Sequence, residues 1–343
     1  MSARDYDVKW ALAPTKKESA YDTQIVNGDL TAAWPFKDLD LADFNLDLMS
    51  DRDEYGRGHE WPTDTEIELK DAAFRRGFDL SCESLAWILA FGLGTVSSAQ
   101  QGETAAYLHT IKPLAPGTSV QLPSLSVVEQ LNTGAKRLFT GLCVSDFAIS
   151  GEGPNGRLKL EANFMGSGTK AASSIDMPSL TAVHFLRMGD VTFSLGPSGS
   201  EVDISSRLKR FSFGWNNQLM GDDGYYPGTG SVRGRLEYGV KRNFTCSFTL
   251  RHSGDTTDHD YLDNQTELSL IVAIDTGTAI ADSYNWLANL YAPKYVVTKL
   301  TPTIIDGLEY VDIEIEGRYD STAVGPFYAS VMTSETGYLT ASS

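Results

Sequence analysis

Cysteine is scarce in this sequence, and long apolar runs are absent. Cys82, Cys143 and Cys246 are the only cysteines among 343 residues, and they lack the close spacing of a redox or zinc-binding pair. An odd number of widely separated cysteines argues against a disulfide framework and fits a reducing compartment. No apolar run is long enough to span a membrane, and residues 1–9 lack the hydrophobic region of a signal peptide. We therefore expect a soluble protein made inside a cell, with no membrane partner.

Basic residues are also in short supply. Lys and Arg total 28 against 45 Asp and Glu, which gives a formal net charge of −17. Tight binding to nucleic-acid phosphates or to anionic lipid requires clustered Lys and Arg, so both functions are disfavoured. An acidic protein can still enclose DNA without holding it.

Residues 151–156 match the letters of a dinucleotide-binding fingerprint. That motif works only where it leads from a strand into a helix whose N–H groups face the pyrophosphate. Here it leads into a segment with a period of two, so a hairpin turn is the better interpretation.

A cluster of possible metal ligands lies between residues 252 and 260, and it consists of His252, Asp255, Asp258, His259 and Asp260. The alternative is a polar loop that leads into a helix, whose N-terminus favours Asp. No further His or Cys has ligand spacing, so the loop is favoured and we expect no metal and no cofactor.

Three acidic residues, Asp312, Glu314 and Glu316, alternate along one strand and point to the same face. Their spacing, about 6.5–7 Å per two residues, resembles that of an inverting glycosidase pair. Nothing in the sequence would raise the pKa of one of them, and no nucleophile motif occurs. A solvated acidic face is favoured over an enzyme.

The clearest structural signal is a hairpin at residues 138–165. Its second strand alternates apolar residues (Leu158, Leu160, Ala162, Phe164) with polar ones (Arg157, Lys159, Glu161, Asn163). This period of two predicts a half-buried strand, and the Gly-rich connector predicts the turn. Residues 81–94 predict the best helix, with Ser81 as N-cap, Gly94 at its end and an apolar stripe that must lie on a sheet.

The two halves of the chain repeat the same order of elements. Phe74, Phe78 and Leu80 correspond to Phe244, Phe248 and Leu250 at an offset of 170, and the strand beginning at Leu158 corresponds to the one at Val311. Repetition of order and spacing indicates a tandem duplication. We predict a mainly β protein with two antiparallel sandwich or barrel domains, each with one helix on its sheet. The expected boundaries are 1–30 (arm), 31–168 (first domain), 169–180 (linker), 181–335 (second domain) and 336–343 (tail).

Three segments in this order resemble the tail tube (major tail) proteins of bacteriophages with long, non-contractile tails. They are the helix at 84–93, the hairpin formed by 139–150 and 158–166, and residues 208–217. The resemblance covers most of residues 35–330. It implies a structural virion protein whose rings stack into a hollow tube through which DNA passes during ejection. Six tube domains normally make a ring, so two domains per chain imply a trimeric, pseudo-hexameric ring.

The resemblance also implies roles for particular residues and partners. The polar faces of the two equivalent strands are candidates for the lumen, and more acidic than basic side chains are expected to face the channel. The candidate lumen residues are Arg157, Lys159, Glu161, Asn163, Asp312, Glu314 and Glu316. Two equivalent polar loops are candidates for ring stacking: Asp51, Arg52, Asp53, Glu54 and Tyr55, with Asp222, Asp223, Tyr225 and Tyr226. Asn216 and Asn217 are candidates for subunit contact. The implied partners are further copies of the chain, a tape measure protein, and tail tip and terminator proteins, with DNA as cargo only.

One alternative remains open from the residues. A carbohydrate- or receptor-binding β-sandwich of a phage tail is suggested by five scattered tryptophans, Trp10, Trp34, Trp61, Trp215 and Trp286. Scattered tryptophans are more often core or interface residues than a stacking platform.

Overall fold

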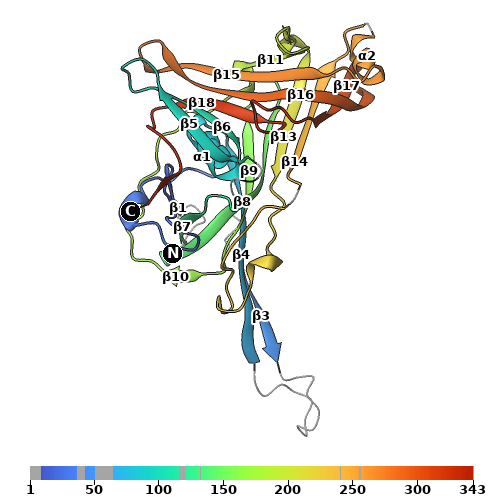
Figure 1. Ribbon diagram of the computed structural model, residues 1–343. Helices are drawn as coiled ribbons and strands as arrows, with labels where there is room; N and C mark the ends of the chain where they lie inside the picture. The colour runs from blue at the N-terminus through green and yellow to red at the C-terminus, as the bar shows by residue number, and fades with distance from the viewer. Residues whose placement is uncertain are drawn as a thin grey trace, which may run out of the picture.

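The computed structural model describes residues 9–36, 43–50, 65–115, 117, 120–131, 133–239, 241–254 and 256–342. The chain is mainly β, as predicted, and seventeen of its strands belong to one hydrogen-bonded network. In the described part of the chain this network does not close into a barrel. It forms two packed layers and a smaller group of strands beside them (Figure 1).

The first layer is a long antiparallel sheet of eight strands. In spatial order it runs β3–β4–β9–β8–β13–β14–β17–β16. The strands are β3 (Asp43–Ser50), β4 (Thr65–Asp79), β9 (Lys159–Met165), β8 (Lys136–Glu152), β13 (Leu208–Asn216), β14 (Asn243–Arg251), β17 (Leu308–Gly317) and β16 (Tyr284–Ile305). The predicted hairpin at 138–165 is confirmed as β8 and β9, with a turn and no helix after residue 152.

The second layer shares one strand with the first. Residues 284–295 of β16 pair with β15, and residues 287–291 also pair with β18, whereas residues 295–305 pair with β17. The second layer therefore runs β5–β6–β18–β16–β15–β11–β12. Its other strands are β5 (Gly94–Gln100), β6 (Tyr107–Pro113), β18 (Tyr328–Thr333), β15 (Leu268–Ala281), β11 (Val191–Gly196) and β12 (Val202–Asp203).

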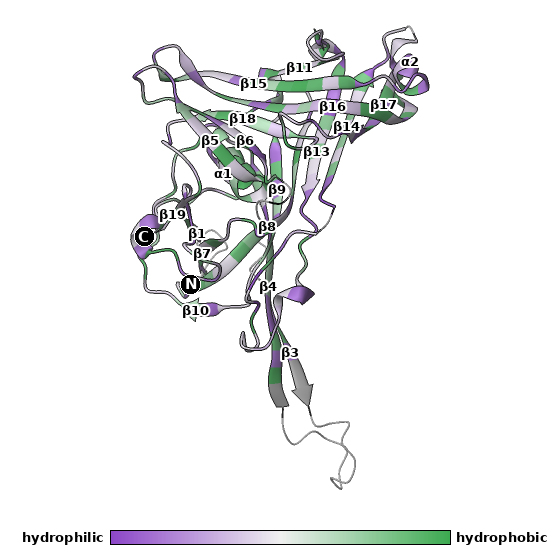
Figure 2. Cartoon of the chain, in the orientation of Figure 1, coloured by the Kyte–Doolittle hydropathy of each residue, from purple (hydrophilic) through white to green (hydrophobic). Residues whose placement is uncertain are grey.

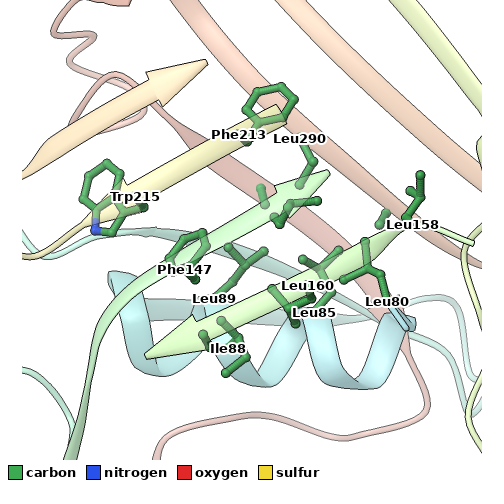
Figure 3. Packing of buried hydrophobic residues seen from close by; sticks show 14 of the residues in the cluster. Leu80, Leu85, Ile88, Leu89, Phe147, Leu158, Leu160, Phe213, Trp215 and Leu290 are labelled. Atoms are coloured by element: carbon green, nitrogen blue, oxygen red, sulfur yellow. The ribbon is translucent and has the colours of Figure 1, made fainter. Parts of the chain in front are cut away.

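Helix α1 (Cys82–Leu93) lies in the core between the layers (Figure 3). Ser81 caps it by accepting from the Ser84 amide, and Gly94, with φ of 94°, ends it in the left-handed region, as predicted. The expectation that only one face would be buried is wrong, because every residue of α1 except Glu83 is buried. A helix that is apolar all round belongs inside a core. Its neighbours in Figure 3 come from both halves of the chain, for example Leu160, Phe213 and Leu290.

The N-terminal segment is part of the folded body. β1 (Lys9–Leu12) pairs with β7 (Leu125–Gln130), and β7 pairs with the first part of β8. That part of β8 also pairs with β10 (Lys170–Ala172). The short strands β2 (Lys16–Lys17) and β19 (Thr340–Ala341) join the two ends of the chain in parallel. The described part of the expected arm is thus packed on the chain's own sheet, and the expected linker contains a paired strand.

The remaining elements are short. Helix α2 (Thr257–Asp263) confirms the helix expected near residue 258. The described residues also contain 3₁₀ turns at η2 (Asn27–Asp29), η4 (Met188–Asp190), η5 (Ser205–Arg207) and η6 (Asp222–Gly224). β4 is a single long strand whose pairing with β3 shifts register between Asp47 and Leu48.

The order of pairing recurs along the long sheet. In the first half of the chain the strands lie side by side in the order β3, β4, β9, β8. In the second half the corresponding strands lie in the order β13, β14, β17, β16. The two sets meet where β8 pairs with β13 from Asp146 to Glu152. They share one hydrophobic core, so the two halves form a continuous structure.

Candidate functional site

One face of the long sheet is polar across its central strands. Along β9, the second half of β8, β13, β14 and β17, buried residues mostly alternate with exposed or half-buried ones, for example Phe211 and Phe213 with Arg210 and Ser212. The strand register aligns these polar residues in rows across the sheet. One row runs through Asp79, Lys159, Ser150, Ser212, Ser247, Glu314 and Lys299.

Small side chains in the middle of this row leave a hollow of about 830 Å³ in the polar face. Ser150, Ser212 and Ser247 form its floor, because serine fills little of the space above a sheet. Charged side chains from the outer strands surround it, among them Lys159, Asp312 and Glu314. The hollow spans the junction between the two halves of the chain.

Opposite charges on this face are matched between nearby strands, and the Arg210–Asp312 pair spans β14. The four pairs are Arg75–Glu161 at 2.5 Å, Arg157–Asp79 at 3.0 Å, Arg210–Asp312 at 3.2 Å and Lys299–Glu314 at 2.7 Å. Exposed pairs of this kind each contribute about 0–1 kcal/mol to stability. Their main effect is to neutralise the face locally, so that it is polar without presenting a basic patch.

All seven residues expected to face a channel lie on this one face. Arg157, Lys159, Glu161 and Asn163 belong to β9 and its entrance, whereas Asp312, Glu314 and Glu316 belong to β17. β8, β13 and β14 separate the two sets, which places them about 19 Å apart across the sheet. Sequence reasoning missed their ion-pair partners Arg75, Asp79, Arg210 and Lys299. The alternation of charged and apolar residues in β13 was the signal that identifies Arg210.

The residues expected in the ring-stacking loops differ in whether the structure describes them and in how exposed they are. Asp51, Arg52, Asp53, Glu54 and Tyr55 lie outside the described residues. Asp222, Asp223 and Tyr226 are exposed. The Tyr225 hydroxyl, however, donates a hydrogen bond of 2.6 Å to the carbonyl oxygen of Lys70, so this side chain is engaged within the chain.

Asn217 is an internal residue, and its side chain is not a surface for another subunit. It is fully buried, donates to the carbonyl oxygens of Gly92 and Val144 at 2.9 Å each, and accepts from the Trp215 indole at 2.8 Å. Asn217 therefore links the C-terminal end of α1 to β8 close to the β8–β13 junction. Asn216 is half-buried on the polar face and remains a candidate.

The observation behind a carbohydrate-binding function does not hold for the described tryptophans. Trp10, Trp34, Trp215 and Trp286 are each at most 7% exposed, so they are core residues and form no exposed stacking platform. Trp61 lies outside the described residues.

The candidate metal cluster is not assembled. Asp258 is buried and bonded to Arg207, and the Nδ1 atom of His252 accepts from the Gly254 amide. Asp255 lies outside the described residues. Nowhere in the described ranges do three His, Cys, Asp or Glu side chains gather as a metal site.

The candidate glycosidase carboxylates are matched with cations or hydroxyls. Asp312 accepts from Arg210 and Thr249, and Glu314 from Lys299. Both lie on the open polar face rather than in an apolar pocket, where burial would raise a carboxyl pKa for acid catalysis.

A family model described as phage tail tube protein matches residues 77–318. The chain belongs to the phage tail tube protein family. The match begins in β4 and ends just after β17, so it includes the entire junction of the long sheet and helix α1. No curated protein matches the chain.

Membership of the tail tube family gives the chain a structural role. It is a component of the virion tail, and proteins of this family assemble with copies of themselves into a tube. Neither helix in the described ranges has the length and hydrophobicity needed to cross a membrane.

Proposed function

We propose that the polar face of the long sheet lines the lumen of a tube built from stacked rings, and that phage DNA passes along it during ejection. The observation that carries this proposal is a single eight-stranded sheet, apolar on one face and polar on the other. In the described part of the chain, β3 pairs only with β4, and residues 296–305 of β16 pair only with β17. Such edges are templates for pairing with another chain.

Each ring contains three chains in this proposal. The repeated ladder order supports two tube domains per chain, at 31–168 and 181–335, and three chains then supply six four-stranded panels. A barrel of three such sheets, about 24 strands at 4.8 Å spacing and 40° tilt, has a mean radius of about 24 Å. Six chains would double that radius. Native mass spectrometry of rings, or the symmetry of the polymer, distinguishes the two.

Charge on the polar face supports passage of DNA without binding. Ion pairs neutralise most of the charges among the described residues of this face, and the other acidic residues there, Asp146, Glu152 and Glu316, outnumber the other basic ones, Lys159 and Arg251. A weakly acidic wall repels phosphate and releases no counterions on contact, so DNA slides. The lumen residues are therefore Arg157, Lys159, Glu161, Asn163, Asp312, Glu314 and Glu316, together with their ion-pair partners.

The partners in this proposal are further copies of the chain, a tape measure protein inside the growing tube, and tail tip and terminator proteins at its ends. The chain is made and assembled in the host cytoplasm. Asn216 contacts a neighbouring subunit, and the loops around residues 51–55 and 222–226 contact the next ring.

Accessibility of a single added cysteine tests the inner wall. The three native cysteines are buried, so a new thiol is the main target of a thiol reagent. Ser247→Cys lies on the polar face, and Ser97→Cys lies on β5 in the other layer; both positions are exposed. Each variant is treated with a large polymer-linked maleimide, once as dilute protein and once after tubes have formed, as checked by negative-stain microscopy.

The expected result is equal labelling of the two variants in dilute protein and loss of labelling at position 247 in tubes. Position 97 should remain reactive in tubes. Equal labelling of position 247 before and after tube formation would show that the polar face is outside, and failure of the concentrated wild-type protein to form rings or tubes would contradict the assembly itself.

A further inference from the structure

Two hairpins that occupy equivalent places in the long sheet have different conformations. The β3–β4 hairpin extends away from the body of the molecule (Figure 1). Its equivalent, β13–β14, is joined by residues 217–242, which fold back against the lower part of β4. We call residues 217–242 the brace.

The brace bonds directly to the backbone of β4. The Lys70 amide donates to the carbonyl oxygen of Ser231 at 2.7 Å, and the Lys70 carbonyl oxygen accepts from the Tyr225 hydroxyl at 2.6 Å. Lys70 lies opposite Leu46 in the β3–β4 ladder. The brace thus holds the hairpin at the point where it leaves the body.

Arg233 is the centre of this contact. It is only 5% exposed, and its guanidinium donates to Asp71 at 2.5 Å, to the Gly166 carbonyl at 2.9 Å and to the Gly221 carbonyl at 2.9 Å. Its own amide donates to the carbonyl oxygen of Ser167 at 2.8 Å. One side chain therefore joins β4, the end of β9 and the brace.

The same edge of β4 is also packed closely against the backbone of residues 166–168. Gly168 has a φ of 90°, and a Cβ atom there would lie 2.3 Å from the carbonyl oxygen of Lys70. Only glycine fits this approach. The root of the hairpin is therefore held by the segment at 166–168 together with the brace.

Beyond this root the described part of the hairpin has little support and exposes aliphatic side chains. Leu46 is 43% exposed and Ile67 is 46% exposed. Figure 2 shows hydrophobic residues on the projecting hairpin as well as in the body. The direction in which this aliphatic surface points is set at the root.

We propose that the brace aims the β3–β4 hairpin at another copy of the chain, and that Arg233 is the positioning residue of the brace. This inference rests on the proposed function, because the partner is a further subunit of the tube. In a ring of three chains, projecting hairpins and braces then alternate. The two kinds of stacking loop are therefore not equivalent, and the stacking contacts follow threefold rather than sixfold symmetry.

Arginine is required at position 233 because one planar group must reach a carboxylate and two carbonyl oxygens at once. Lysine keeps the positive charge but presents a single ammonium group, which cannot make the hydrogen bonds to Asp71, Gly166 and Gly221 at the same time. Arg233→Lys is therefore the informative variant. Arg235→Lys is the matched control, since Arg235 lies in the same segment but its side chain is 51% exposed and paired with Glu237 at 3.4 Å.

Hydrogen exchange on the dilute protein tests the brace alone. Arg233→Lys should accelerate exchange of the Lys70 amide and its neighbours in β4 at least tenfold, with no change at α1, and Arg235→Lys should match the wild type. Unchanged exchange at Lys70 in Arg233→Lys would overturn the assignment of Arg233, whether or not the wild type forms tubes.

Polymerisation tests the consequence for assembly. The critical concentration for tube formation should rise at least tenfold in Arg233→Lys and stay unchanged in Arg235→Lys. Ser81→Ala, which weakens the cap of α1 far from the hairpin, controls for simple loss of stability and should polymerise normally. Normal polymerisation of Arg233→Lys despite faster exchange at Lys70 would contradict the positioning role, whereas absence of tubes in the wild type would contradict the proposed function instead.

Discussion

The buried carboxylate of Glu129 should be among the most sensitive positions for the stability of the fold. Glu129 lies on β7 with no solvent exposure and accepts from Arg76 on β4 at 2.8 Å, from Trp10 on β1 at 3.3 Å and from Arg137 on β8. The Arg76 guanidinium is itself fully buried, with its Cζ atom 4.1 Å from the centre of the Trp10 ring. One carboxylate therefore joins four strands, including the N-terminal one.

Glu129→Gln keeps the volume of the side chain but removes its charge. Breaking a buried ion pair from one side typically destabilises a protein by about 3–5 kcal/mol, because the remaining charge stays in the interior. Glutamine retains one acceptor oxygen, and Arg137 is partly exposed to water, so we expect the lower end, about 3 kcal/mol. That is a large fraction of the 5–15 kcal/mol that ordinarily stabilises a folded domain.

Urea unfolding followed by tryptophan fluorescence measures this loss. Glu152→Gln, an exposed carboxylate on the polar face, is the control and should change the free energy of unfolding by less than about 0.5 kcal/mol. If the loss reflects an uncompensated charge, the double variant Arg76→Met with Glu129→Met should be more stable than Glu129→Gln alone. A loss below about 1 kcal/mol in Glu129→Gln would refute the reasoning.

Three further predictions concern the pH dependence of stability, the junction of the sheet and the helix cap. Burial lowers the pKa of His109 to about 4, so the folded state disfavours the protonated imidazole. The free energy of unfolding should therefore fall by about 1 kcal/mol per pH unit as the pH drops from 6.5 towards 4. The melting temperature of His109→Gln should depend less on pH than that of the wild type, and identical pH profiles would contradict this. Gly151→Val should destabilise the β8–β13 junction by about 1–3 kcal/mol, because a Cβ atom there would lie 2.8 Å from the Phe211 ring, and an unchanged melting temperature would argue against this packing. Ser81→Ala should lower the free energy of unfolding in urea by about 1 kcal/mol, and a loss near zero would show that the Ser84 bonds do not stabilise α1.

Local patterns in the sequence predicted the elements whose partners are nearby in the chain. The alternation from Leu158 to Phe164 identified β9 and assigned its polar and apolar faces correctly. The cap at Ser81 and the glycine at position 94 located α1 to within a residue at each end. These features depend on backbone preferences and side-chain periodicity, which act over a few residues.

Contacts between distant residues were not accessible to the same reasoning. Residues 1–30 lack periodicity, yet Trp10 is buried because its ring covers Arg76 and its indole bonds to Glu129, a residue 119 positions away. A short apolar segment gives no sign of which remote strand it will join. The repeat between the halves predicted that the two polar loops are equivalent, but it contained no information that one of them would fold back and bond to β4 through Arg233.

Two tube domains in one chain would also change how the proposed ring closes. In the proposed ring, six panels meet at six junctions, and three of these are β8–β13 junctions that already exist inside each chain. Only the three junctions between β16 of one chain and the β3 edge of the next must form by association. Each intermolecular step loses translational and rotational freedom worth an estimated 4–15 kcal/mol, so joining two panels in one chain removes three such losses from every ring. The linkage further allows the two halves to diverge, because neighbouring panels are no longer identical copies. One hairpin can then project towards another subunit while its equivalent braces it, a division of roles that six identical domains in a symmetric ring could not adopt.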